Sequence, residues 1–275
     1  MKFGIWFFGL GTVLAGILDI AWRAFDASHQ PINSLGNVPG QNVLACVMGI
    51  WLILGGVAVL SRRSVRLGAT ASGAAYLVFA LLWLCRYYSG IHALGWRIDV
   101  ILGVSFGLAQ QLMLVAPAAI IYAAVTSTNS PLRSRATIAA RWMLGLPPIV
   151  FGLLHLIGIQ VFAKIVPHWI HFGSLWAALT GVAFLLAGLA ICSGKRDVLA
   201  ARLLALMLLL FEVLVEIPPT FVRLHNEATW GAAVYNLTAI GACLIFAEFL
   251  ASRADRESVG PAENPTMSHL DPVVA

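Results

Sequence analysis

Long apolar runs, each close to the length of a membrane span, divide this chain. A helix needs about 20 predominantly apolar residues to cross roughly 30 Å of hydrocarbon. Backbone groups in lipid must be satisfied internally, so each such run is predicted to be a helix. Eight segments meet the requirement: Gly4–Arg23, Asn42–Leu60, Val65–Cys85, Arg97–Val125, Ala140–Ile165, His171–Cys192, Val198–Thr220 and Thr229–Ala251.

Composition supports this pattern. Of the 275 residues, 60% are hydrophobic and 11% are charged, and the mean hydropathy is +0.89. Soluble globular domains carry about 25% charged residues. The composition therefore excludes a soluble globular enzyme, a disordered chain and a collagen-like fibre, and it predicts an all-α polytopic integral membrane protein. The first span carries Asp19 and Arg23, so it is expected to be retained and not cleaved as a signal peptide.

The basic residues that flank the spans predict an orientation. Arg62, Arg63 and Arg66 lie in one turn, Lys195 and Arg196 lie in another, and both turns fall on the same side of the predicted membrane. Cytoplasmic loops carry the excess of lysine and arginine, so both termini are expected to be cytoplasmic. The positive charges sit beside helix ends, and we therefore expect a lipid bilayer and no nucleic acid as partner.

Two stretches of the first half of the chain return in the second half. Residues 16–20 (GILDI) are similar to residues 152–156 (GLLHL), and residues 49–56 (GIWLILGG) are similar to residues 181–188 (GVAFLLAG). This predicts two parallel four-helix repeats related by an axis along the membrane normal. The first, diverged repeat would span residues 1–125 and the second residues 140–251. A cytoplasmic linker (126–139) would join them, and a disordered cytoplasmic tail (252–275) would follow.

The second repeat resembles the DoxX-like family of small bacterial membrane proteins. The resemblance rests on residues 151–155 (FGLLH), on residues 163–170 (AKIVPHWI) and on the helix that begins at Ala200, and it covers roughly residues 140–246. It implies a four-helix unit in a bacterial inner (plasma) membrane and an association with thiosulfate:quinone oxidoreductases or redox stress. The sequence departs from the family pattern at His171 and, in the first repeat, at Asp19.

Four ionisable residues inside the predicted spans are candidates for catalysis: Asp19, His155, Glu212 and Glu216. Charged side chains in the membrane are costly, so each one is a functional hypothesis. Glu212 and Glu216 are four residues apart on one helix face and repel each other when both are charged. The alternative is purely structural pairing, as between Asp19 and Arg23, which have the same spacing.

Four further residues fringe the outer ends of the helices and are candidates for ligand binding: Arg23, Asp99, Arg223 and His171. Nearly all the polarity within the spans thus lies toward the outer side. Pro218 and Pro219 are expected to break the seventh helix just beyond Glu216, because proline lacks the N–H that a helix interior uses.

Metal and thiol chemistry have weaker signals. No metal-binding signature is present, so no metal is expected. The four cysteines include no Cys-x-x-Cys pair. Cys46 and Cys85 lie near outer helix ends, and the sequence leaves open whether they form a disulfide or remain free thiols.

Three functions remain open at this stage. The leading hypothesis is a redox-associated protein that handles a small hydrophobic, quinone-like molecule in an outward-facing polar pocket, with a membrane or soluble redox partner. In it, His155 and Glu216 exchange protons with the ligand and Glu212 tunes Glu216. The second is a membrane-embedded lipid or isoprenoid cyclase or isomerase, with Glu212 or Asp19 as the acid. The third is a non-catalytic scaffold or transporter subunit.

Overall fold

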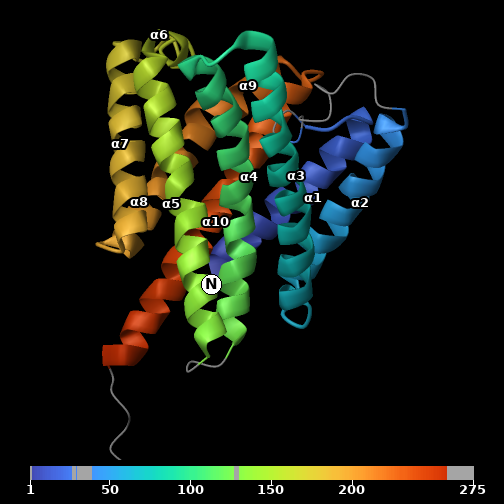
Figure 1. The fold of residues 1–275 in the computed structure, drawn as a ribbon, viewed down its shortest axis with the longest axis vertical. Coiled ribbons are helices and arrows are strands. Elements are labelled where there is room, and N and C mark those ends of the chain that lie inside the picture. The colour runs from blue at the N-terminus through green and yellow to red at the C-terminus, as the bar shows by residue number, and fades with distance from the viewer. Residues whose placement is uncertain (1, 27–28, 30–38, 127–129, 259–275) are drawn as a thin grey trace, which may run out of the picture.

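The computed structural model describes residues 2–26, 29, 39–126 and 130–258, and this part of the chain is helical with no strands (Figure 1). The elements are α1 (Lys2–Trp22), α2 (Gln41–Leu60), α3 (Val65–Leu94), α4 (Ile98–Val125), α5 (Pro131–Ile157), α6 (Ile159–Phe162), α7 (Gly173–Ser193), α8 (Asp197–Phe211), the π-helix η3 (Glu212–Glu216), α9 (Ile217–Val222) and α10 (Glu227–Ser258).

Eight of these helical segments in the described residues are long and apolar enough to cross a membrane, which confirms the all-α polytopic prediction. They are α1, α2, α3, α4, α5, α7, the continuous stretch from α8 through η3 to α9, and α10 up to Ala254. Large apolar side chains point outward from several of them, for example Trp6, Leu54 and Leu186, which are 62–65% exposed. Such an apolar exterior fits a lipid bilayer.

The eight long helices form a closed ring, because each packs on its neighbours in chain order and α10 packs back on α1. Two of these contacts join the halves of the chain: α4 packs on α5, and α1 packs on α10. Helix α10 also contacts α4 across the ring and is the most buried of the eight (Figure 1). The fourth helix of each half therefore packs on the first helix of the other, and the two halves interlock.

Glycine lets the first two helices of each half approach backbone to backbone. A Cβ on Gly56 of α2 would lie 2.8 Å from the carbonyl oxygen of Gly9 in α1. In the second half, a Cβ on Gly188 of α7 would lie 2.7 Å from the carbonyl oxygen of Gly145 in α5. Small residues at such interfaces allow close van der Waals packing between membrane helices.

The same correspondence continues along both helix pairs. Gly16 lies against the Gly49 carbonyl, and Gly152 lies against the Gly181 carbonyl. We call the distance along the sequence from Gly16 to Gly152 the first offset, and that from Gly49 to Gly181 the second offset. The pair Gly9 and Gly145 obeys the first offset, and the pair Gly56 and Gly188 obeys the second.

The second offset also relates the helices that follow. Helix α7 begins at the second offset from the start of α2, and α8 begins at the second offset from the start of α3. The buried positions of α3 return in α8 at this offset: Gly68, Ala69, Gly73 and Tyr76 correspond to Ala200, Ala201, Ala205 and Leu208.

Several element boundaries differ from the sequence expectation. Helix α5 begins at Pro131, so most of the predicted linker 126–139 is helical. Ser130 caps this helix by accepting a hydrogen bond from the Leu132 N–H at 3.3 Å, and proline is well suited to the first helical position. Helix α3 continues to Leu94. Helix α10 continues to Ser258, into the predicted disordered tail, whose residues 259–275 lie outside the described part.

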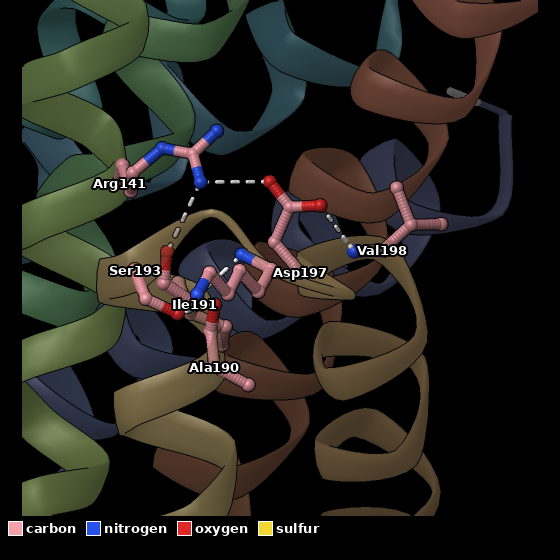
Figure 2. Close-up of polar contacts among 7 residues, drawn as sticks. Arg141, Ala190, Ile191, Ser193, Asp197 and Val198 are labelled. Carbon is pink, nitrogen blue, oxygen red and sulfur yellow. Dashed lines mark hydrogen bonds and ion pairs between the residues drawn. The ribbon is translucent and has the colours of Figure 1, made fainter.

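We call the end of the bundle that carries α6 and α9 the upper end, as in Figure 1, and the opposite end the lower end. At the lower end of the second half, an ion pair ties α5 to the turn between α7 and α8 (Figure 2). Arg141 Nη1 lies 2.8 Å from Asp197 Oδ2 and donates to the Ile191 carbonyl at 3.2 Å. Asp197 Oδ1 accepts from the Val198 N–H at 2.8 Å, so one carboxylate pairs with Arg141 and also binds a backbone N–H in the first turn of α8, where a negative charge is favourable.

The glycine contacts generate a stability prediction. Gly16→Ala and Gly152→Ala are each expected to cost about 1–3 kcal/mol, because the added methyl group meets backbone that cannot yield without separating the helices. Gly103→Ala in α4 is the matched control, since a Cβ there meets nothing within 4 Å. Thermal unfolding in detergent measures the difference. A melting temperature for Gly16→Ala equal to that of Gly103→Ala contradicts the packing described.

Candidate functional site

The upper end of the second half contains a histidine enclosed by aromatic rings. The ring of His155, on α5, stacks on Phe162 of α6 with centroids 3.8 Å apart and lies 5.3 Å from the ring of Phe184 on α7. Phe184 in turn contacts Phe211 at the end of α8, at 6.2 Å. His155 Nδ1 lies 2.8 Å from the carbonyl oxygen of Phe151. A carbonyl only accepts hydrogen bonds, so Nδ1 carries the hydrogen and Nε2 of the neutral ring is an acceptor.

The carboxyl group of Glu212 faces α10. Glu212 follows Phe211 directly, is 6% exposed, and accepts a hydrogen bond from Asn236 Nδ2 at 3.1 Å. The same Asn236 amide donates to the Leu208 carbonyl at 2.7 Å, so α10 fixes both the carboxyl group and the last turn of α8. We refer to His155, Phe162, Phe184, Phe211 and Glu212 as the His155 cluster. Glu216 lies one turn further along and is half-buried.

The helix around Glu212 is a π-helix, not the break predicted at Pro218 and Pro219. Residues Glu212–Glu216 form η3, and α9 continues through both prolines to Val222. A proline ring clashes with the carbonyl four residues before it and offers no N–H to it. The wider π turn just before the prolines accommodates both effects without ending the helix. Such π segments occur frequently at functional sites.

The upper end of the first half contains a buried ion pair. Asp19, on α1, is fully buried, and its Oδ2 lies 3.4 Å from Nδ1 of His29. His29 is only 2% exposed, although it lies in the segment between the membrane-spanning helices α1 and α2. The chain beyond α1 returns to this carboxylate, because the Asp26 N–H donates to Asp19 Oδ1 at 2.9 Å. The His29 ring stacks on Phe79 of α3, with centroids 4.2 Å apart and an interplanar angle of 10°.

Aromatic and acidic groups close around this pair. Phe25 contacts Phe79 edge to face, and the hydroxyl of Tyr76, on α3, donates to Thr12 Oγ1 at 3.2 Å. At the start of α10, Glu227 has a buried carboxyl oxygen with no hydrogen-bond partner in the described part of the chain. Asp26, also buried, lies against Gly231 one turn later. We refer to Asp19, Asp26, His29, Tyr76 and Phe79 as the Asp19 cluster.

The two clusters differ in exposure. Asp19, His29, Tyr76 and Phe79 are each at most 2% exposed. His155, Phe162 and Phe211 are only partly buried. The first half is thus sealed at its upper end, whereas the second half presents its histidine and two of its rings to the surroundings.

The ion pair that the spacing predicted between Asp19 and Arg23 does not form. Helix α1 ends at Trp22, and Arg23 follows in left-handed backbone with φ 51° and an exposed side chain. The spacing of four residues places two side chains on one face only while the helix continues. Asp19 turns instead to His29.

The other residues predicted for ligand binding lie on the surface. Asp99 is 58% exposed and pairs with Arg97 at 2.7 Å. Arg223 and His171 are exposed as well, beyond the end of α9 and just before α7, respectively. The structure therefore places Glu212 beside Phe211 and Asn236, and Asp19 beside His29, while Arg23, Asp99, Arg223 and His171 lie outside both clusters. Their role in binding stays a prediction.

Sequence reasoning missed His29, Asp26 and Asn236. His29 and Asp26 lie in a polar segment between two spans, where a hydropathy pattern predicts exposure, and their burial depends on the fold of the chain onto α3. Asn236 sits within an apolar helix, and a lone amide inside a predicted span was a signal that pointed to it.

The described residues provide no support for a metal site or a disulfide. Within the described residues, no group of three or more histidine, cysteine, aspartate or glutamate side chains is arranged to hold a metal ion. All four cysteines are free, including Cys46 and Cys85.

Comparison of the chain with models of protein families, with curated proteins and with solved structures found no match. The arrangement of the two clusters therefore carries the functional argument.

The Asp19 cluster generates a pH prediction. Burial alone would lower the pKa of His29, but the Asp19 carboxylate beside it, with a smaller contribution from Asp26, raises that pKa above its ordinary value of 6.5. A group whose pKa is raised by folding stabilises the fold fully below its unfolded pKa, and this contribution is lost as the pH rises through the folded value. The melting temperature is expected to fall over that range, by about 2–4 °C per kcal/mol lost.

The double variant Asp19→Asn/His29→Phe is the control, because it keeps an aromatic ring against Phe79, removes the titrating pair and leaves no unpaired carboxylate at position 19. Its melting temperature is expected to lack this alkaline decline. Tyr76, Glu227 and Asp26 face the same region and remain in both proteins. Parallel pH profiles for the wild type and the double variant would contradict a charged His29.

Proposed function

We propose that this chain is a DoxX-like, redox-associated membrane protein that handles a small hydrophobic molecule with a quinone-like head group at the upper end of its second half. It lies in a bacterial inner membrane with both termini in the cytoplasm. The basic residues of the α2–α3 and α7–α8 turns, such as Arg62 and Lys195, support this orientation, because both turns lie at the lower end.

The His155 cluster is the observation that carries the proposal. It combines flat apolar surface, from Phe162, Phe184 and Phe211, with a histidine that has an acceptor nitrogen and with a carboxyl group fixed by Asn236. A planar head group with oxygen substituents needs both kinds of contact, because its faces are apolar and its edge forms hydrogen bonds. The partial exposure of His155 supports entry from the bilayer or from the outer side.

We assign proton exchange to His155 and Glu216. Reduction of a quinone adds two electrons and two protons, and oxidation of the hydroquinone releases them. His155 and Glu216 accept or supply the protons, while a membrane or soluble redox partner supplies or removes the electrons. Glu212, one π turn from Glu216, tunes its charge, because two carboxylates so close disfavour a second negative charge. Arg223 and His171 are the exposed ligand-binding candidates of the second half, and Arg23 and Asp99 are those of the first half.

Internal duplication is part of the same proposal. Repeated glycine contacts, equal spacing of helix starts and matching burial in α3 and α8 support two copies of one four-helix unit. The even number of spans in each copy gives both the same orientation, as the parallel repeat requires.

Co-purifying small molecules test this function. Protein purified in mild detergent is extracted and the extract is analysed by mass spectrometry, for the wild type, Glu216→Gln and Lys195→Gln. Lys195→Gln is the control, because it removes an exposed charge at the lower end. A quinone or its hydroquinone is expected with the wild type and the control, and its amount is expected to fall at least about tenfold in Glu216→Gln, since one charge-assisted hydrogen bond is lost.

Other outcomes point to the alternative functions. An isoprenoid or its cyclised product, with no quinone, favours the cyclase or isomerase and makes Glu212 the acid, because Asp19 already accepts two polar contacts. Equal amounts of ordinary phospholipid from all three proteins contradict the proposed function and favour a scaffold or transporter subunit.

A further inference from the structure

We propose that both halves carry the same ring-binding site, that His29 of the chain itself fills the first, and that the second binds a planar ring bearing a hydroxyl group. This inference rests on the proposed function and its internal duplication, and it narrows the ligand class to hydroquinones and related phenols. It follows from comparing the two clusters position by position.

The first shared position is that of Asp19 and His155. The first offset, which relates Gly16 to Gly152 on the same helices, also relates Asp19 to His155. A Cβ on Gly49 would lie 3.3 Å from Asp19 Cβ, and a Cβ on Gly181 would lie 3.0 Å from His155 Cβ. Both side chains therefore leave the first helix of their half at the same place, opposite the same glycine of the second helix.

The second shared position is the aromatic ring on the third helix. Phe211 follows Phe79 at the second offset, which relates the starts of α3 and α8. The buried residues one turn earlier, Tyr76 and Leu208, obey the same offset. In the first half, Phe79 stacks on the His29 ring that pairs with Asp19. In the second half, Phe211 contacts Phe184, whose ring lies against His155.

The third shared position is the segment after the first helix. Phe162 follows Asp26 at the first offset, and each folds back on the key side chain of its own half. The Asp26 N–H donates to Asp19, and the Phe162 ring stacks on His155. The return of the chain over this position is therefore common to both halves, although the chemistry of the contact differs.

In the first half, the group held between these positions is the imidazole of His29. It lies flat on Phe79, and its Nδ1 points to the Asp19 carboxylate, which can only accept when ionised. The first site thus holds a planar ring by stacking on one face and by an ion pair of 3.4 Å at the edge of the ring. The residue at the first offset from His29 is Ile165, which has no ring and is 52% exposed.

The second site offers a ligand a comparable pair of contacts, one to the face of a ring and one to its polar edge. Phe211 provides the stacking face, and His155 Nε2 provides the acceptor, because Nδ1 is committed to the Phe151 carbonyl. A ligand edge that faces Nε2 must therefore donate. A hydroxyl group donates, whereas a quinone carbonyl or a methyl ether does not. Glu212 stands where the first half has Ala80, so the second half has a carboxyl group at a position where the first half has a methyl group.

Binding stoichiometry tests this inference with the full chain in detergent under oxygen-free conditions. The probe is 2-decylhydroquinone, and its dimethyl ether is the matched control ligand, because it has the same ring without a donor. Wild type is expected to bind one probe molecule, with an affinity at least about tenfold higher than for the ether, as one lost hydrogen bond predicts. His29→Gly is expected to bind two, since it frees Phe79 and Asp19.

Variants of the second site locate the wild-type binding. Phe211→Ala is expected to weaken the wild-type affinity about tenfold, and Phe3→Ala, which removes an exposed ring at the lower end, is the control. If the wild type and His29→Gly each bind one probe molecule, the inference is overturned and the proposed function stands. Equal affinity of the wild type for the probe and its ether has the same consequence. Absence of probe binding to wild type overturns the proposed function as well.

If His29→Gly is too unstable for titration with the probe, thermal unfolding provides a second test. Free imidazole or phenol is expected to raise the melting temperature of His29→Gly by replacing the lost ring, and to leave that of His29→Phe unchanged. An equal response of both variants overturns the assignment of His29 as the internal occupant. The comparison of probe and ether on the wild type is independent of these variants.

Discussion

Close backbone contact at glycine sets the geometry of both halves of this protein. Where Gly16 meets Gly49 and Gly152 meets Gly181, the helices approach until carbonyl oxygens lie where a methyl group would stand. Helices in lipid gain little from burying apolar surface, so this close van der Waals contact contributes much of their association. It also fixes the register, and the register decides that Asp19 and His155 leave their helices at equivalent points.

The same frame supports two different chemical environments. In the first half, Asp19 finds its counter-charge within the chain, because the segment after α1 brings His29 against it and the rings of Tyr76 and Phe79 seal the pair. A buried carboxylate needs such compensation, since desolvation is costly. In the second half, His155 needs no counter-charge when neutral, and its surroundings stay partly open. The interlocked packing of α1 on α10 and α4 on α5 holds both environments at one end of the ring.

The sequence predicted what depends on local pattern and missed what depends on folding back. A long apolar run is enough to identify a span, so all eight long helices were found, although α5 begins at Pro131 and not at the expected Ala140. The ion pair of Asp19 was assigned to Arg23 because helical spacing was assumed past Trp22, where the helix ends. His29 was missed since its burial depends on contacts with α1 and α3, which hydropathy does not encode.

A cryo-electron microscopy map at side-chain resolution, in lipid nanodiscs, tests whether one helical unit is used twice. Duplication predicts that α1, α2 and α3 superpose on α5, α7 and α8 with Asp19 on His155 and Phe79 on Phe211, while α1 packs on α10 and α4 on α5. A shift of α8 along α7 by even one residue, relative to α3 along α2, would move Phe211 away from Phe184 and contradict the shared architecture of the two halves.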